Sequence, residues 1–135
     1  MVKRRLLDTD TLSYILKQLE PVASKARAYI SDDGDIAISA ITYYEIMRGL
    51  KFAGATQQLQ AFEDFAQLND VLAVDADVCR RAAEVHAELR RSGALIEDAD
   101  LLIAATALVN ECVLVTNNIA HYARISGLEF ENWAA

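Results

Sequence analysis

Apolar residues occur along this chain in two spacings: short continuous runs, and longer stretches in which they recur every three or four residues. The short runs predict strands over residues 3–7, 35–39, 71–74, 112–115 and 128–133. The helical spacing predicts helices over residues 11–19, 21–30, 42–54, 56–68, 76–91 and 98–109. Strands that alternate with helices are typical of βαβ units. We therefore expect a three-layer α/β fold in which helices flank a central, mainly parallel sheet.

Polar residues at the starts of these helices are predicted to cap them. Thr9 or Asp10 would cap the first helix, and Thr42 with Glu45 has the form of a capping box for the third. The other boundary residues that the pattern predicts are Gly49 or Gly54 in or after the third helix, Asp75 and Gly93 around the fifth, and Asn118 before a short turn over 119–124.

Residues 96–109 form the longest apolar stretch, and acids stand at its head. The stretch has four alanines and is much shorter than the roughly 20 residues that cross a bilayer, so it predicts a buried helix. Asp98 and Asp100 then lie where a core helix begins. The free N–H groups and the helix dipole favour negative charge there, and Asp98 is the predicted N-cap.

The composition is that of a folded domain. With 135 residues, of which 53% are hydrophobic, the chain is long enough for one domain over residues 1–135 with a full core. No charged segment near the start leads into a long apolar one, so we expect no export or membrane segment. Cys79 and Cys112 lack metal-ligand spacing, and we interpret both as reduced core thiols of a cytoplasmic protein.

The formal net charge of −7 disfavours a polyanion as partner. Six of the twenty acids, however, fall in three short segments: Asp8, Asp10, Glu45, Glu97, Asp98 and Asp100. Without these six the chain is close to neutral. If they gather and hold divalent cations, nucleic acid is not excluded as a partner.

The predicted topology brings several polar residues to one rim of the sheet. In α/β folds, ligands bind outside the carboxyl ends of the strands. Asp8 ends the first strand, Glu45 follows the second by one helical turn, and Asn118 follows the fourth. Asp98 and Asp100 open the helix that leads into that fourth strand.

Each of these residues could be a cap, but Glu45 and Asp100 are not needed once Thr42 and Asp98 have capped their helices. Carboxylates about 5 Å apart repel by roughly 3 kcal/mol per pair at an effective dielectric constant near 20. Several such pairs destabilise a domain unless they are protonated or share a cation. All-oxygen ligands without a His or Cys set favour Mg²⁺ or Mn²⁺ over zinc.

Four segments of the chain resemble the four sequence blocks of PIN domains, and most of all those of VapC-type ribonuclease toxins of toxin–antitoxin pairs. The segments are residues 6–12 (LLDTDTL), 38–50 (ISAITYYEIMRGL), 96–105 (IEDADLLIAA) and 115–118 (VTNN), and residues 127–133 fit too. A single block is weak, whereas four in order at fitting spacing are specific. The resemblance covers essentially the whole chain.

The resemblance implies an endoribonuclease that depends on Mg²⁺ or Mn²⁺, with Asp8, Glu45 and Asp100 as the metal-binding acidic centre. It places Asn118 where many relatives have a fourth acid and makes Thr116 a supporting hydroxyl. It also implies a homodimer and a cognate antitoxin protein as partner. The chain departs from the family pattern with acids at two positions, Asp10, where Asn is frequent, and Glu97, where Gly is frequent.

In the mechanism that we expect, Asp8 and Asp100 hold the first ion, Glu45 holds or orients the attacking water, and Asn118 completes the shell. Asp98 is a supporting residue beside them. Arg48 follows Glu45 by one turn and either meets the phosphate or pairs with Glu45 along the helix. The basic pairs at 80–81 and 90–91 are read as solvated helix surface and not as an RNA track.

Two alternatives remain. Residues 8–12 also resemble the nucleophile motif of haloacid-dehalogenase-type phosphatases, which need a lysine from the later half of the chain. The lysines are Lys3, Lys17, Lys25 and Lys51, all in the first half. The second alternative is a non-catalytic PIN scaffold that only binds a partner, in which the acidic centre would usually be broken.

Aromatic and apolar residues of the first half exceed what one small domain easily hides, and they favour a dimer. They are Tyr14, Tyr43, Tyr44, Phe52, Leu59 and Phe62. The alternative is that they form core.

Overall fold

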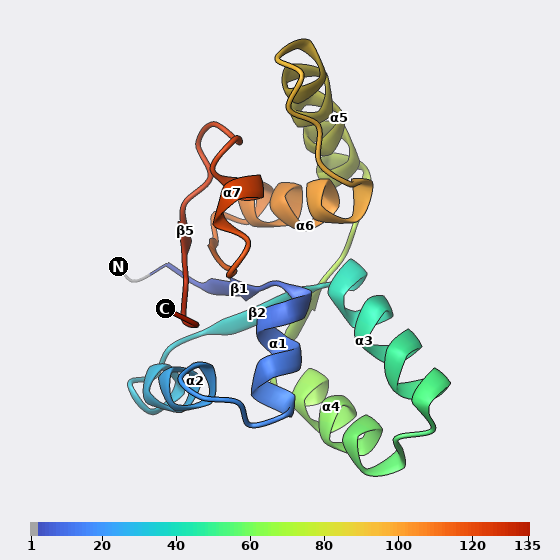
Figure 1. The fold of residues 1–135 in the computed structure, drawn as a ribbon, viewed down its shortest axis with the longest axis vertical. Coiled ribbons are helices and arrows are strands. Elements are labelled where there is room, and N and C mark those ends of the chain that lie inside the picture. Colours follow the sequence, from blue (N-terminus) through green and yellow to red (C-terminus); the bar gives the residue numbers. More distant parts are fainter. Residues whose placement is uncertain (1–2) are drawn as a thin grey trace.

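The computed structural model describes residues 3–135, and within this range the chain forms five strands and seven helices (Figure 1). In chain order they are β1 (Arg5–Leu7), α1 (Thr9–Leu16), α2 (Val22–Ser31), β2 (Ile36–Ser39), α3 (Ala40–Ala53), α4 (Thr56–Leu68), β3 (Asp70–Leu72), α5 (Ala76–Arg91), α6 (Asp98–Val109), β4 (Val113–Val115), α7 (Ile119–Tyr122) and β5 (Phe130–Glu131).

The five strands form one sheet in the order β3-β2-β1-β4-β5, and every neighbouring pair is parallel. This confirms the predicted three-layer α/β fold. The strands are short, and all residues of β2 and β4 are buried. Strands covered on both faces are the expected form of a parallel sheet, because the crossover helices occupy both sides.

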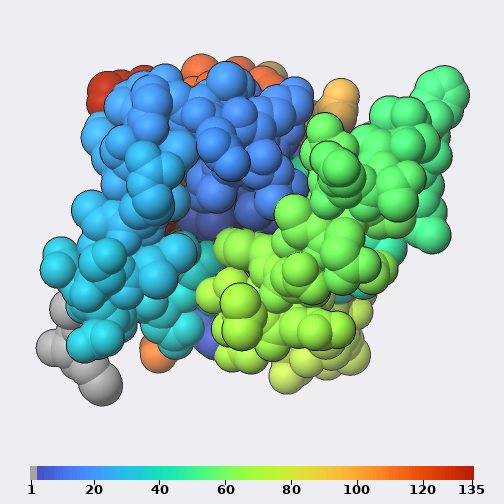
Figure 2. Space-filling model, turned by 90° about the horizontal axis from the view of Figure 1, so that it is seen from below, coloured from blue at the N-terminus to red at the C-terminus, as the bar shows by residue number. Residues whose placement is uncertain are grey.

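The two faces of the sheet carry separate hydrophobic cores. Successive residues of a strand point to opposite faces, and Leu6 and Leu7 of β1 divide in this way. Leu6 packs with residues of α5, α6 and α7, whereas Leu7 packs with residues of α1 to α4. Figure 1 shows the first group of helices above the sheet and the second below it, and Figure 2 views the second group from outside.

The helix α6 is the buried core helix that the apolar stretch predicts. Leu101 and residues 103–107 are buried, and α6 packs along α5 and against β4. Thr106 lies in this apolar surrounding, but its hydroxyl donates to the carbonyl of Leu102 at 2.7 Å. The small alanine side chains let neighbouring elements approach the helix from every side.

Two predicted helix caps are wrong, and in both cases the true cap stands closer to the preceding strand. Asp8 caps α1 by accepting from the backbone N–H of Thr11 at 2.9 Å, so the helix starts at Thr9. Ser39, the last residue of β2, caps α3 in place of Thr42. The reason is that each strand runs directly into its helix without a loop, so the residue at the junction meets the free N–H groups.

The start of α6 also differs from the prediction. Asp98 is the first residue of the helix and not its N-cap, and Glu97 occupies the cap position without a side-chain hydrogen bond to the helix. Asn118 holds the N-cap position of α7, yet its side chain does not cap the helix. Asp75 and Gly93 bound α5 as predicted.

Gly54 and Cys112 lie as predicted, whereas Cys79 does not. Gly54 ends α3 in a left-handed conformation with φ of 64°, which glycine adopts without steric cost. Cys112 is buried, but Cys79 is exposed on α5, so its prediction as a core thiol is wrong. Cys79 follows the buried Val78, and adjacent residues on a helix point in different directions.

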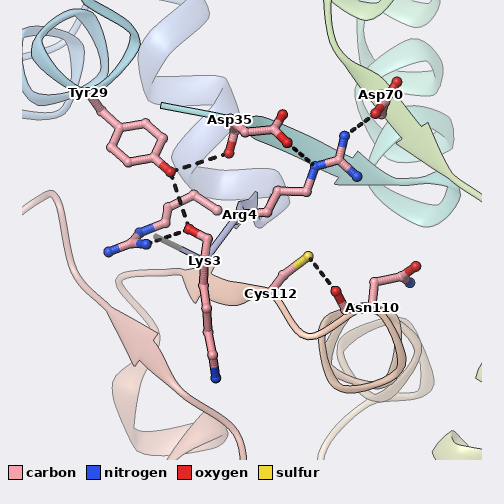
Figure 3. A network of polar contacts seen from close by, with 8 residues as sticks. Lys3, Arg4, Tyr29, Asp35, Asp70, Asn110 and Cys112 are labelled. Carbon is pink, nitrogen blue, oxygen red and sulfur yellow. Dashed lines mark hydrogen bonds and ion pairs between the residues drawn. The ribbon is translucent and has the colours of Figure 1, made fainter. Parts of the chain in front are cut away.

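At the amino ends of the strands, a polar network joins three neighbouring strands (Figure 3). Arg4, just before β1, pairs with Asp70 of β3 and through Nε with Asp35 before β2 at 3.0 Å. Burial acts against the charge of Arg4, but the two carboxylates together raise the pKa of its guanidinium. The network lies at the edge of the sheet opposite to the carboxyl ends of the strands.

Among residues 3–135, no helix is both long enough and apolar enough to cross a membrane.

Candidate active site

A crevice of about 110 Å³ opens at the carboxyl ends of the strands, where the sequence predicts the acids to gather. It is lined by Asp8, Thr9, Asp10, Glu45, Asp100, Ile103, Asn118 and Tyr122. The four residues predicted as the centre of the site therefore share one crevice, although they come from four places in the chain. Thr116, Arg48 and Asp98, the predicted supporting residues, are not part of its lining.

Asp8 forms the floor of the site. It follows β1 directly and is only 5% exposed. Burial raises the pKa of its carboxyl, and the charge of Asp10 adds to the increase, while hydrogen bonds from Thr116 and Thr11 act in the opposite direction. Thr116 is fully buried, so it supports Asp8 from inside the domain and does not line the crevice.

Glu45 reaches the crevice from the second turn of α3. Thr9 donates its hydroxyl hydrogen to Glu45 Oε1 at 2.6 Å, and the Thr9 hydroxyl also lies 3.1 Å from that of Thr42. Arg48 does not form the alternative pair with Glu45 that its spacing allowed. It is exposed, and its guanidinium lies over the ring of Tyr44 at 5.1 Å.

Asp100 and Asn118 meet at the opposite wall, with His121 between them. Asp100 Oδ2 lies 3.6 Å from His121 Nδ1, and the Asn118 side-chain amide lies 2.8 Å from the same ring nitrogen. The backbone N–H of Asn118 donates to the Thr116 hydroxyl at 2.9 Å. These contacts tie the start of α6 to the segment that follows β4.

Tyr122 experiences the negative charge of all three carboxylates. Its side chain is almost fully buried, and burial together with the charges of Asp100, Asp8 and Glu45 raises the pKa of its phenol. The phenol therefore stays protonated at neutral pH and can donate a hydrogen bond into the crevice.

The sequence analysis did not identify Thr9, His121 and Tyr122 as site residues. Thr9 stands between Asp8 and Asp10 at the end of a predicted strand, and this position already indicates that it lies at the site. His121 and Tyr122 follow Asn118 by three and four residues, so a single helical turn returns them to its side. The predicted turn over 119–124 was the available signal for both residues.

Asp98 and Asp100 face different surroundings, as residues two apart on a helix do, because they are rotated by about 200°. Asp98 is exposed and borders a separate hollow of about 240 Å³ between α5 and α6, next to Ala82 and His86. Only Asp100 belongs to the acidic crevice.

The donor set fits an oxygen-liganded divalent cation in type. Four carboxylates and one amide line the crevice, and none of the eight lining residues is Lys or Arg that could neutralise them. Within residues 3–135, however, no three acid, His or Cys side chains stand close enough together to hold one ion as they are placed. Like charges repel, and Asp8, Glu45 and Asp100 each face a partner of their own, namely Thr11, Thr9 and His121.

The crevice does not match the phosphatase alternative. That chemistry requires a lysine beside the nucleophilic aspartate to hold the phosphoryl group. The residues that line the described crevice include no lysine. Asp8 and Asp10 therefore lack the partner that the nucleophile motif needs.

An all-parallel α/β domain with an acidic crevice at the carboxyl ends of its strands is the architecture of a PIN domain. The sequence profile described as "PIN domain" matches residues 5–128. Because the match covers most of the chain, this protein belongs to the PIN domain family.

Within that family the chain is similar to VapC ribonucleases. It is 29% identical to the "tRNA(fMet)-specific endonuclease VapC" of Shigella flexneri, over 96% of this chain and 97% of the relative. It is 30% identical to "Ribonuclease VapC2" of Rickettsia felis, over 95% of this chain and 96% of the relative.

Solved structures agree with this placement. The structure of VapBC2 from Rickettsia felis bound to a promoter DNA fragment aligns with a TM-score of 0.84 at 29% identity, over 96% of this chain and 98% of the matched chain. That of DNA-bound VapBC from Salmonella typhimurium aligns with a TM-score of 0.85 at 29% identity, over 98% and 99%. PIN-domain VapC ribonucleases are metal-dependent in general.

Proposed function

We propose that this protein is a metal-dependent endoribonuclease and the toxin of a toxin–antitoxin pair. The observation that carries the proposal is the shared crevice of Asp8, Glu45 and Asp100, which no lysine or arginine lines. The VapC relatives, which are named ribonucleases and match along almost their whole length, support the same activity.

Asp8, Glu45 and Asp100 would hold the cation, and Mg²⁺ or Mn²⁺ fits their all-oxygen character. When bound, such a cation supplies the positive charge that activates water and stabilises a leaving oxyanion. Asn118 would add a neutral oxygen donor. Thr116 supports Asp8 through a hydrogen bond that favours its charged form.

Glu45 orients the attacking water in this proposal. Its carboxylate is held on one side by the Thr9 hydroxyl, which leaves the other oxygen free to accept a proton from water. The phenol of Tyr122 remains protonated and donates to oxygens that gain negative charge in the crevice. Arg48 is exposed on α3 and stays available for an RNA phosphate at the rim.

The antitoxin is proposed to bind in a groove beside the crevice. A groove of about 480 Å³ runs between α1 and α3, and Thr9, Asp10 and Glu45 border both hollows. Leu16, Ile46 and Leu50 give it an apolar wall. A partner segment in this groove would cover the approach to the acids, and the solved VapBC structures are complexes of a VapC with its partner.

Two further proposals concern the chain as a whole. The first is that the chain is a single domain, which is supported by the pairing of strands from both ends of the described range, between Arg5 and Glu131, within one sheet. The protein acts in the cytoplasm, where its RNA substrate occurs and where the free thiols of Cys79 and Cys112 remain reduced.

The test is cleavage of structured RNA, with tRNA included because the Shigella flexneri relative is named a tRNA(fMet)-specific endonuclease. Mg²⁺ or Mn²⁺ should support cleavage and raise the melting temperature, because an ion that binds only the folded state stabilises it. EDTA should abolish both effects. Undiminished cleavage in EDTA would disprove metal dependence.

The non-catalytic scaffold is separated by the same experiment. A scaffold would neither cut RNA nor gain stability from Mn²⁺. The matched control is Glu84→Gln, which removes an exposed carboxylate of α5 that pairs with Arg81 far from the crevice. This variant should behave as the wild type in both assays.

A further inference from the structure

His121 contacts two of the proposed site residues, although the sequence did not single it out. Its Nδ1 lies 2.8 Å from the side-chain nitrogen of Asn118 and 3.6 Å from Asp100 Oδ2. The ring lies on α7, one helical turn beyond Asn118, and its side chain is 40% exposed at the edge of the site. Only the contact with Asn118 has the length of a hydrogen bond.

The direction of this hydrogen bond follows from the placed orientation of the Asn118 amide. The Asn118 amide is placed with its nitrogen toward His121, and an amide nitrogen can only donate, so in this orientation it donates and His121 Nδ1 accepts. The imidazole then carries its proton on Nε2. With its nitrogen bonded to His121, Asn118 has its carbonyl oxygen left for the crevice that it lines.

An asparagine amide has two orientations of nearly the same shape, and the acidic crevice by itself favours the wrong one for a cation. The negative carboxylates of Asp8, Glu45 and Asp100 attract the NH₂ end. An NH₂ group turned toward the crevice would repel a cation, whereas the oxygen would bind it. A hydrogen-bond acceptor outside the crevice is therefore needed to hold the NH₂ end away.

We propose that His121 is a positioning residue that supplies this acceptor and holds the carbonyl oxygen of Asn118 toward the crevice. The proposal rests on the metal-dependent function proposed above and deepens it. It assigns a role to Nδ1 alone and none to Nε2. Outer partners that orient a metal's ligands typically contribute 10- to 100-fold in affinity or activity.

The first test uses the metal-free protein. Nitrogen-15 chemical shifts of the His121 ring at neutral pH distinguish the two tautomers directly. We expect the tautomer with the proton on Nε2, and in Asn118→Ala this preference should weaken because the donor to Nδ1 is gone. A ring protonated on Nδ1 in the wild type would overturn the proposal.

The second test uses two substitutions that each keep one half of the imidazole. The oxygen of asparagine lies close to where Nδ1 was, whereas the polar end of glutamine reaches the place of Nε2. We expect His121→Asn to keep most of the Mn²⁺ affinity measured by calorimetry. His121→Gln and His121→Ala should each lower it about 10-fold or more.

The opposite pattern, with His121→Gln retained and His121→Asn impaired, would instead assign the function of the ring to Nε2, for example as a donor to an RNA phosphate. In an Asn118→Ala background, His121→Ala should cause no further loss, because a positioning residue acts only through its partner. An additional loss there would contradict the proposal. Thermal unfolding in EDTA checks that every variant folds.

These outcomes separate the inference from the proposed function. A wild-type protein that neither binds Mn²⁺ nor cuts RNA would refute the function itself. If the wild type binds Mn²⁺ and all three variants at His121 bind it equally well, only the positioning role fails.

Discussion

Replacing Asp100 by Asn should abolish cleavage and yet stabilise the protein in metal-free buffer. Asp100 lies in the crevice with Asp8 and Glu45, and its side chain is only 28% exposed. Carboxylates about 6 Å apart repel by roughly 3 kcal/mol per pair at an effective dielectric constant near 20. Solvent reduces this value, and Asp100 also gains from lying near the positive end of the α6 dipole, so we expect a net gain of about 1 kcal/mol in the free energy of unfolding.

Asp98→Asn is the matched control, because it removes the same charge from the same helical turn. Asp98 is exposed and borders the hollow beside α5. Its carboxylate lies near the positive end of the α6 dipole, so its loss should lower the free energy of unfolding by about 0.3–1 kcal/mol. The two substitutions should therefore change stability in opposite directions, and only Asp100→Asn should affect the chemistry.

Urea unfolding in EDTA measures the stability of both variants, and RNA cleavage with calorimetric Mn²⁺ titration measures their function. Asp98→Asn should retain cleavage and Mn²⁺ binding. Loss of activity in Asp98→Asn with retention in Asp100→Asn would show that the wrong acid was assigned to the crevice. A stability loss in Asp100→Asn would refute the argument from repulsion.

Three further predictions follow from other parts of the structure. Burial raises the pKa of Asp8 in the folded state, so the charged carboxylate lowers the free energy of unfolding at any pH above the ordinary carboxyl pKa. Asp8→Asn should therefore stabilise the metal-free protein at pH 7. Urea unfolding should show that this gain vanishes as the pH falls below about 4. Arg4→Met should lower the free energy of unfolding by about 1 kcal/mol, since Asp35 and Asp70 lose their partner, and high salt should shrink the difference. The carboxyl end of α3 projects from the domain (Figure 2), and the side chain of Phe52 in its last turn is 88% exposed, which favours a homodimer. Phe52→Ser should then lower the mass measured by light scattering. A wild type that is monomeric at micromolar concentration would contradict this prediction.

The sequence by itself determined the layers of the fold. The alternation of short apolar runs with helical spacing already implies crossover connections, and these produce a parallel sheet covered on both faces. The buried helix α6 was equally evident, because a stretch that is apolar on every side has to lie in the core. The gathering of Asp8, Glu45, Asp100 and Asn118 followed from the same topology, since the carboxyl ends of parallel strands share one rim.

Only the tertiary structure decided the details that depend on direction. Whether Ser39 or Thr42 caps α3 depends on the residue at which the strand ends, and sequence spacing leaves this open by a few residues. The family resemblance favoured Asp100 over Asp98, but the packing of α6 against α5 is what sets the rotation that leaves only Asp100 in the crevice. His121 lies one helical turn after Asn118, but only the packing of α7 beside the start of α6 brings its ring near Asp100, and no local spacing indicates that contact. Patterns along a chain specify which faces are buried, whereas the partner of an individual polar side chain is specified by the packing of elements distant in the sequence.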